Sequence, residues 1–253
     1  MNSVDLNCDL GEGVVSDAVE LALLDCVTSA NIACGGHAGD AASIRRLALA
    51  CVERGVGIGA HPSYPDRAGF GRDSLGMGPK DIASAVESQL RAFVCAIRDV
   101  RGARVVHIKP HGALYHDAMR NNAVADAIRE AAKAALPEAM LMGQAGAPCL
   151  ERWRSEGASV VSEAFADRRY EPDGSLRSRK LEGALLETVA EVAAQALSIA
   201  HDGQVRLADG SSLTIAAETI CLHSDTPGAA ESARQVHRVL VANGIAVRPL
   251  KWK

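Results

Sequence analysis

A short apolar segment, a polar loop and a longer amphipathic stretch recur about seven times along this chain. The apolar segments predict strands at 4–10, 28–34, 56–60, 104–109, 139–143, 159–165 and 218–223. The amphipathic stretches predict helices at 17–26, 41–54, 79–100, 123–136, 147–156, 184–200 and 228–242. Repeated strand–helix units with short connections indicate a parallel α/β sheet, either a closed barrel or an open doubly wound sheet.

Two segments depart from this alternation. Residues 61–78 contain several glycines and prolines, and we expect a mobile loop beside a site. Residues 204–215 predict a β-hairpin with Asp209 and Gly210 in its turn. Because no linker is visible and 253 residues suit one large α/β core, we expect a single domain spanning 1–253.

Composition excludes several classes of partner. The net charge of −4 and the scattered basic residues argue against nucleic acid as a partner. The sequence has no apolar run long enough to cross a bilayer and begins without a signal-peptide pattern, so we expect no membrane association. Seven cysteines without a CxxC motif indicate reduced, mostly buried thiols in a cytoplasmic protein.

Polar and titratable residues collect where the predicted strands end. In the first strand Asn7 and Asp9 alternate with apolar residues, although a parallel strand covered on both faces normally reads as continuously apolar. Similar groups occur in or directly after the other strands: Asn31, His37, His61, Lys109, His111, Glu163, Asp167, Arg168 and His223. Because sites in α/β folds form at the carboxyl edge of the sheet, we expect these side chains around one cleft.

Several common motifs are absent from the sequence. It contains no GxxxxGK[ST] phosphate loop, no GxSxG nucleophile turn and no HExxH metal motif. We expect His116 to lie in a loop outside the site, and His201 and His237 to lie at the surface of helices.

Six stretches together resemble the LamB/YcsF family, also called the family of 5-oxoprolinase A subunits. They run in order from Asp5 to Asp225: DLNCDLGE, TSANIACGGHAGD, IGAHPSYPDRAGFGR, HIKPHGALY, EAFADRRY and ICLHSD. The resemblance implies a single-domain, distorted TIM-like (β/α) barrel, related to the glycoside hydrolase and deacetylase barrels. It also implies an enzyme that, with partner subunits B and C, opens 5-oxo-L-proline (pyroglutamate) to L-glutamate with ATP hydrolysis.

The chain differs from the family pattern in two places. The family usually has an aromatic residue where this sequence has Gly36, and the segment after Glu12 is shorter and lacks aromatics. We expect both differences to alter the wall of the pocket.

The resemblance and the chemistry of the side chains suggest roles. We expect Asp9, His61, Lys109, His111 and Glu163 to be catalytic. We expect Asn7, Glu12, Asn31, His37, Arg72, Asp167, Arg168 and His223 to bind substrate. Asp9 or Glu163 would act as general base and His61 or His111 as its acid–base partner. Lys109 and Arg168 would hold a carboxylate or a phosphoryl oxygen. Since no phosphate loop is present, we expect ATP and Mg²⁺ to be handled with the partner subunits.

Two alternatives stay open. One is a metal-dependent amidase or deacetylase, in which Asp9, His37, His61 and His111 are competent ligands for zinc or a similar ion, although their spacing carries no metal signature. The other is a non-catalytic regulator that binds a carbohydrate or another metabolite. The sequence leaves homo-oligomerisation open.

Overall fold

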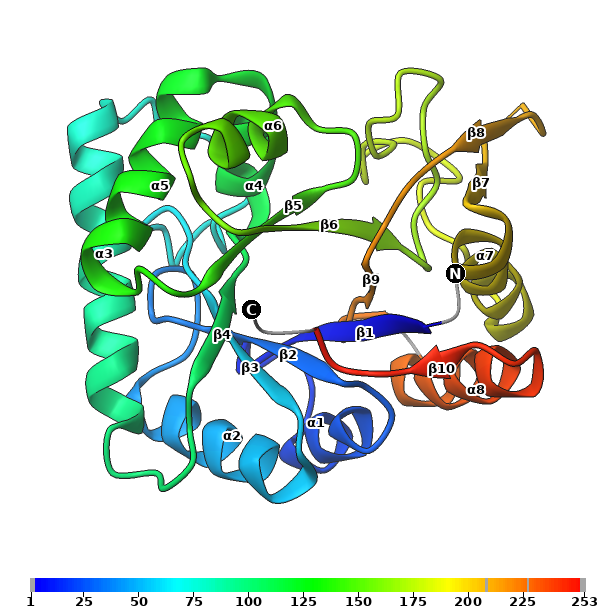
Figure 1. Ribbon diagram of the computed structural model, residues 1–253, viewed down its shortest axis with the longest axis horizontal. Coiled ribbons are helices and arrows are strands. Elements are labelled where there is room, and N and C mark those ends of the chain that lie inside the picture. Colours follow the sequence, from blue (N-terminus) through cyan, green and yellow to red (C-terminus); the bar gives the residue numbers. More distant parts are fainter. Residues whose placement is uncertain (1–2, 208, 227, 251–253) are drawn as a thin grey trace.

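The protein is a closed parallel barrel of seven strands, seen in a computed structural model that describes residues 3–207, 209–226 and 228–250 (Figure 1). Its strands are β1 (Ser3–Leu10), β2 (Ser29–Ala33), β3 (Gly57–His61), β4 (Val105–Ile108), β5 (Met140–Gln144), β6 (Val160–Phe165) and β9 (Thr219–Leu222). They pair in that order, and β9 pairs back onto β1. The predicted strands are therefore confirmed, and the open doubly wound alternative is wrong.

Helices surround the barrel, as Figure 1 shows. The predicted helices are confirmed as α1 (Asp17–Leu24), α2 (Ala41–Arg54), α3 (Pro79–Ile97), α5 (Asn122–Ala135), α6 (Pro148–Ser155), α7 (Val189–Asp202) and α8 (Ala229–Ala242). The start predicted for α7 at residue 184 is wrong, because the helix begins at Val189. One further helix, α4 (Gly112–Arg120), forms directly after β4, where the sequence predicted a loop. A two-residue strand, β10 (Ala246–Val247), pairs with the start of β1 and is too short for periodicity to detect.

Local sequence signals explain where two of these helices begin and end. The Asp40 side chain accepts a hydrogen bond from the Ser43 backbone N–H, and the Ser43 hydroxyl accepts one from the Asp40 backbone N–H. This reciprocal cap starts α2, and Gly55 ends it with a φ of 68°. Thr188 and Glu191 cap the start of α7 in the same way.

The predicted hairpin is also confirmed. Strands β7 (Gln204–Arg206) and β8 (Ser212–Thr214) pair in antiparallel fashion. In the turn, Asp209 accepts a hydrogen bond from the Ser211 backbone N–H, and Gly210 has a φ of 86°. The hairpin lies outside the closed barrel and does not contribute to its sheet.

Two expectations about the whole chain can be compared with the structure. All seven cysteines are free thiols, and all but Cys95 are buried, as predicted. Among the described residues, no helix combines the length and the apolar character that crossing a bilayer requires.

Candidate functional site

A cavity of about 360 Å³ opens at the carboxyl ends of the barrel strands. This is within the size range of small-molecule sites. Of the predicted site residues, those that line it are Asp9, Glu12, His61, Arg72, Lys109, His111, Arg168 and His223. The predicted convergence on one cleft is therefore confirmed for these side chains. The remaining predicted residues, Asn7, Asn31, His37, Glu163 and Asp167, lie behind the cavity wall.

The floor of the cavity is a buried lysine between two carboxylates. Lys109 Nζ lies 2.9 Å from Asp9 Oδ1 and 2.9 Å from Glu163 Oε1. Burial by itself would lower the pKa of Lys109, but the two carboxylates outweigh it and hold that pKa well above its usual range. Burial would likewise raise the pKa of Asp9, yet Lys109 and His61 keep it well below its usual range. The floor is therefore ionic.

Glu163 is fully engaged beneath the cavity. Its Oε2 accepts a hydrogen bond of 2.8 Å from the Tyr115 hydroxyl, and its Oε1 faces Lys109. Burial and the neighbouring Glu163 raise the pKa of Tyr115 well above its usual range, so the phenol stays a donor. Tyr115 belongs to α4, the helix that was not predicted from the sequence, and its hydrogen bond to Glu163 was not predicted either.

Asn31 orients Asp9 and is itself bonded to Asn7 and His107. Asn31 Nδ2 donates to Asp9 Oδ1 at 2.8 Å and to Asn7 Oδ1 at 2.7 Å, while His107 Nε2 donates to Asn31 Oδ1. Burial lowers the pKa of His107 to about 3, so this ring is neutral. The expectation that Asn7 and Asn31 contact substrate needs correction, because neither lines the cavity; Asn31 holds the carboxylate that does, and Asn7 accepts from Asn31.

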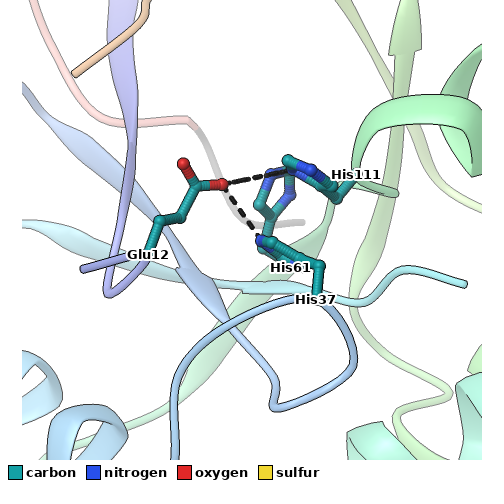
Figure 2. A group of neighbouring side chains, drawn as sticks. All are labelled: Glu12, His37, His61 and His111. Carbon is teal, nitrogen blue, oxygen red and sulfur yellow. Dashed lines mark hydrogen bonds and ion pairs between the residues drawn. The ribbon is translucent and has the colours of Figure 1, made fainter. Parts of the chain in front are cut away.

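Three histidines and one glutamate form a compact group, the histidine–glutamate cluster of Glu12, His37, His61 and His111 (Figure 2). Glu12 Oε1 lies 3.1 Å from His37 Nε2, 3.2 Å from His111 Nδ1 and 3.8 Å from His61 Nε2. His61 Nε2 and His111 Nδ1 are 3.0 Å apart. The proposed metal ligand Asp9 is absent from this group, and Glu12, expected only to bind substrate, takes its place.

The charge state of this cluster follows from its burial. Burial lowers the pKa of His37 to about 4 and also lowers the pKa of His111. Their rings are stacked in parallel with centroids 3.6 Å apart, which further disfavours charging both. Burial would raise the pKa of Glu12, but the adjacent His111 and His37 rings hold it below its usual range. A glutamate anion thus faces two imidazoles, His37 and His111, that are neutral near pH 7.

Asp167 orients His223 instead of facing the cavity. The carboxylate accepts hydrogen bonds of 3.0 Å from the backbone N–H and from Nδ1 of His223. Burial would raise the pKa of Asp167, but His223 outweighs it and keeps that pKa low. The expected contact of Asp167 with substrate therefore needs correction: Asp167 supports His223, and His223 lines the cavity.

The cavity is rich in basic side chains, and Asp225, which also lines it, pairs with Arg72 and Arg179. The basic side chains are Arg72, Arg120, Arg168, Arg179 and Lys180. Arg120 lies on α4, and Arg179 and Lys180 lie in the irregular segment 166–188. The sequence pattern did not predict these three residues as part of the site. His116, expected outside the site, also lies on α4 and lines the cavity, so that expectation is wrong.

Arg168 is the most unusual of these cations. It is only 4 % exposed, and its Nη2 donates to the backbone oxygen of Arg177 at 2.6 Å. Among the described residues it forms no ion pair, and its Nε has no hydrogen-bond partner. A buried guanidinium without an ion pair is costly.

The loop after β3 is tied to the site at several points. Arg67 Nη1 donates to the backbone oxygens of Gly35 and Gly39, and the Phe70 carbonyl accepts from His111 Nε2 at 3.0 Å. The loop thereby contributes Phe70 and Arg72 to the cavity wall. Its mobility stays a prediction.

Gly36 does not shape the cavity as the sequence suggested. It does not line the cavity, and a Cβ at this position would collide with the Gln89 and Ser63 side chains. Gln89 Oε1 accepts from the Ser63 backbone N–H at 3.0 Å, and its Nε2 donates to the Ser63 carbonyl at 2.8 Å. Gln89 from α3 therefore occupies the space beside Gly36, and the expected change of the pocket wall is wrong for this position.

Comparisons with known proteins identify relatives over nearly the whole chain. The LamB/YcsF family model matches residues 4–253. The A subunit of 5-oxoprolinase from Chloroflexus aggregans is 46 % identical over 250 residues, covering 98 % of this chain and 99 % of the relative. The protein of the same name from Neisseria meningitidis is 43 % identical over 247 residues, with 98 % and 99 % covered.

Solved structures give the same fold. The lactam utilization protein from Thermus thermophilus superposes with a TM-score of 0.90 and 36 % identity, covering 98 % of this chain and 100 % of that one. A 3-deoxy-D-arabino-heptulosonate 7-phosphate synthase from Thermotoga maritima, at 9 % identity and a TM-score of 0.51, shares the barrel fold alone; 98 % of this chain and 90 % of that one are covered.

Proposed function

Because this chain belongs to the LamB/YcsF family, we propose that it is the A subunit of a 5-oxoprolinase that opens 5-oxo-L-proline to L-glutamate with ATP hydrolysis. Relatives of 43–46 % identity are named as the A subunit of 5-oxoprolinase, and a solved relative is called a lactam utilization protein. 5-Oxoproline is a five-membered lactam. The word subunit in those names supports assembly with further chains, which we propose to be subunits B and C.

The buried Arg168 is the observation that carries the proposal. Its guanidinium lines the cavity without a carboxylate partner among the described residues. The carboxylate of 5-oxoproline would supply that partner, because a planar guanidinium can hold a carboxylate through two parallel hydrogen bonds. The lactam ring would then extend toward the floor formed by Asp9 and Lys109.

The structure favours one of the two carboxylates expected to act as general base. Both oxygens of Glu163 are engaged by Lys109 and Tyr115, and Glu163 does not line the cavity. Asp9 does line it, and its Oδ2 lies 3.5 Å from His61 Nε2. The Asp9–His61 pair is therefore suited to orient an attacking water and take its proton.

His223 is the group suited to protonate the leaving nitrogen. Asp167 fixes its ring through Nδ1, which leaves Nε2 as the nitrogen available at the cavity. A carboxylate behind an imidazole selects its tautomer and stabilises its protonated form. This assigns the acid and the base to two neighbouring side chains that both line the cavity.

ATP would make the stable amide reactive by phosphorylating its carbonyl oxygen. The sequence lacks a phosphate loop, so we propose that ATP and Mg²⁺ are bound with the partner subunits. Within this chain Arg120, Arg179 and Lys180 line the cavity and suit the charge of a phosphorylated lactam.

Reconstitution tests the proposal. The purified chain, with and without subunits B and C, is incubated with 5-oxoproline, ATP and Mg²⁺, and glutamate and ADP are assayed. We expect turnover only in the complete mixture. Arg168→Gln should lose most of it mainly through a higher KM, whereas Arg101→Gln, at an exposed position, should not.

Two outcomes would contradict this division of labour. Glutamate formed by this chain with ATP but without partners would mean that it holds its own ATP site. Glutamate formed without ATP would favour a simple amidase, the alternative that the histidine–glutamate cluster supports.

A further inference from the structure

Two imidazole nitrogens in the histidine–glutamate cluster face each other without a donor between them. His61 Nδ1 lies 2.6 Å from the Lys109 carbonyl, and His111 Nε2 lies 3.0 Å from the Phe70 carbonyl. Because a carbonyl only accepts, each of these outer nitrogens carries a hydrogen. When both rings are neutral, the inner nitrogens, His61 Nε2 and His111 Nδ1, present lone pairs only 3.0 Å apart. Two lone pairs at that distance repel unless a positive centre lies between them.

Glu12 adds a negative charge to the same point. Its side chain is 6 % exposed, and Oε1 lies 3.2 Å from His111 Nδ1 and 3.8 Å from His61 Nε2. Among the described residues, Glu12 has no lysine or arginine within ion-pair distance; its partners are the three histidines. A buried carboxylate without a permanent cation is costly.

The three distances match a coordination sphere. Zinc bonds to nitrogen and oxygen of about 2.0–2.1 Å place tetrahedral ligands roughly 3.3 Å apart. The observed separations of 3.0, 3.2 and 3.8 Å surround that value. Both histidines also donate their outer N–H to a backbone carbonyl, which is how metal-bound imidazoles are usually oriented.

We infer that Glu12, His61 and His111 bind a divalent cation of the zinc type. All three line the cavity, so a fourth coordination position faces the space where a ligand would bind. Two histidines, one glutamate and an open position form a ligand set that catalytic zinc sites use. The inference concerns this chain alone. In the metal-bound protein His61 Nε2 is a ligand, so Asp9 alone remains as the base of the proposed function.

His37 is a positioning residue in this arrangement. It does not line the cavity, and its Nε2–H donates to Glu12 Oε1 at 3.1 Å. Its ring is parallel to that of His111 at 3.6 Å, so the two lone pairs do not point to a common centre. His37 therefore holds the glutamate ligand.

The neighbouring group of Asp9, Cys221 and His223 is less suited to a cation. Lys109 Nζ lies 2.9 Å from Asp9 Oδ1 and 3.2 Å from Cys221 Sγ, so an ammonium already occupies this point. His223 Nδ1 is bound to Asp167.

Metal binding to the isolated chain tests the inference. The protein is purified without a histidine tag, treated with a chelator, and titrated with Zn²⁺ and with Co²⁺. We expect one equivalent of either metal per chain, visible absorption bands from bound Co²⁺, and a higher Tm with Zn²⁺.

Matched variants locate the ion. Glu12→Gln and His111→Gln, which nearly preserve side-chain size, should weaken Zn²⁺ binding by more than about 100-fold. His37→Gln should weaken it by roughly 10–100-fold, as expected for a group that orients a ligand. His201→Ala, which removes an exposed histidine, should bind one equivalent with unchanged affinity.

Two results would overturn the assignment. One is a wild-type protein that gives no Co²⁺ bands and retains no Zn²⁺ after gel filtration; a proton shared by His61 and His111 would then explain their contact. The other is stoichiometric metal that survives in both Glu12→Gln and His111→Gln. The titration contains neither 5-oxoproline nor the other two chains, so either failure leaves the proposed function to its own test.

Discussion

Lys109 and Asp9, 100 residues apart in the chain, form a buried ion pair at the floor of the cavity, with Nζ 2.9 Å from Oδ1. The lysine is 3 % exposed and also pairs with Glu163. Its position at the end of β4 is therefore explained by two carboxylates delivered by β1 and β6. Since a buried charge is tolerated only when it is paired, these three side chains depend on one another.

Replacing Lys109 with methionine should cost both stability and activity. Lys109→Met keeps the length of the side chain but leaves two buried carboxylates without their cation. Breaking a buried pair in this way typically costs about 3–5 kcal/mol, measurable by urea unfolding. Turnover of the reconstituted enzyme should be abolished, because Asp9 loses the charge that keeps it ionised.

The double variant Lys109→Met/Glu163→Gln separates these effects. Removing one of the stranded carboxylates should restore part of the lost stability without restoring turnover. If Lys109→Met has the same free energy of unfolding as the wild type, the ion pair does not contribute to stability and the assignment of a charged floor is wrong.

Tyr115 should prove important for stability although no pattern in the sequence pointed to it. Tyr115→Phe removes the hydroxyl that donates to Glu163 Oε2 at 2.8 Å and leaves a buried oxygen without that donor. We expect a loss of roughly 1–3 kcal/mol in the free energy of unfolding. Tyr64→Phe is the matched control, because Asp117 Oδ2 keeps a second donor, the Ser74 hydroxyl. Equal losses in the two variants would contradict the special role of Tyr115.

The sequence predicted the barrel because its information is local. Each strand is a short apolar run, and the polar alternation of Asn7 and Asp9 in β1 marked the functional end. Lys109 and His223 could be assigned to the same edge because parallel strands share a direction. Seven strands and the place of the site therefore followed from periodicity and topology.

What the sequence could not supply were distances between side chains. Glu12 is a better candidate ligand than Asp9 because it lies close to three histidine rings. The spacing of these residues along the chain gives no information about those distances. Helix α4 escaped because its nine residues follow directly on a proline-containing strand end and begin with a glycine. Because α4 was not predicted, the roles of Tyr115 and Arg120, which lie on it, were not predicted either. Arg179 was missed because its segment is irregular and is placed by tertiary contacts such as that with Asp225.

Gly36 and Gln89 should be energetically coupled. Gly36→Ala places a methyl group against the Gln89 amide and the Ser63 hydroxyl, and such overpacking typically costs about 1–3 kcal/mol. Gln89→Ala removes the nearer of the two obstacles but also its two hydrogen bonds to Ser63. In the double variant the costs should be less than additive, because only the contact with the Ser63 hydroxyl remains. Strict additivity in urea unfolding would show that Gln89 does not limit the residue at position 36.

Asp5 should make this protein less stable as pH rises toward neutrality. Its carboxyl, 2 % exposed, lies between β1, β2 and β9 and accepts hydrogen bonds of 2.7 Å from the Thr28 and Ser29 hydroxyls. Burial outweighs these bonds and raises the pKa of Asp5 to about 7. In the unfolded chain an aspartate titrates near about 3.9, so between these values the native state holds the extra proton.

The sign and size of the effect follow from that difference. The stabilising contribution of the Asp5 proton is complete below the pKa of the unfolded chain and is lost as pH rises through about 7. A difference of about three pH units corresponds to roughly 4 kcal/mol. Asp5→Asn, which cannot ionise, should therefore flatten the fall in unfolding free energy between about pH 5 and about pH 8, measured by urea titration. Asp73→Asn, at an exposed position, controls for the loss of one charge. Because every other titrating group is common to the variant and the wild type, identical pH profiles would mean that Asp5 is already ionised in the folded protein at low pH.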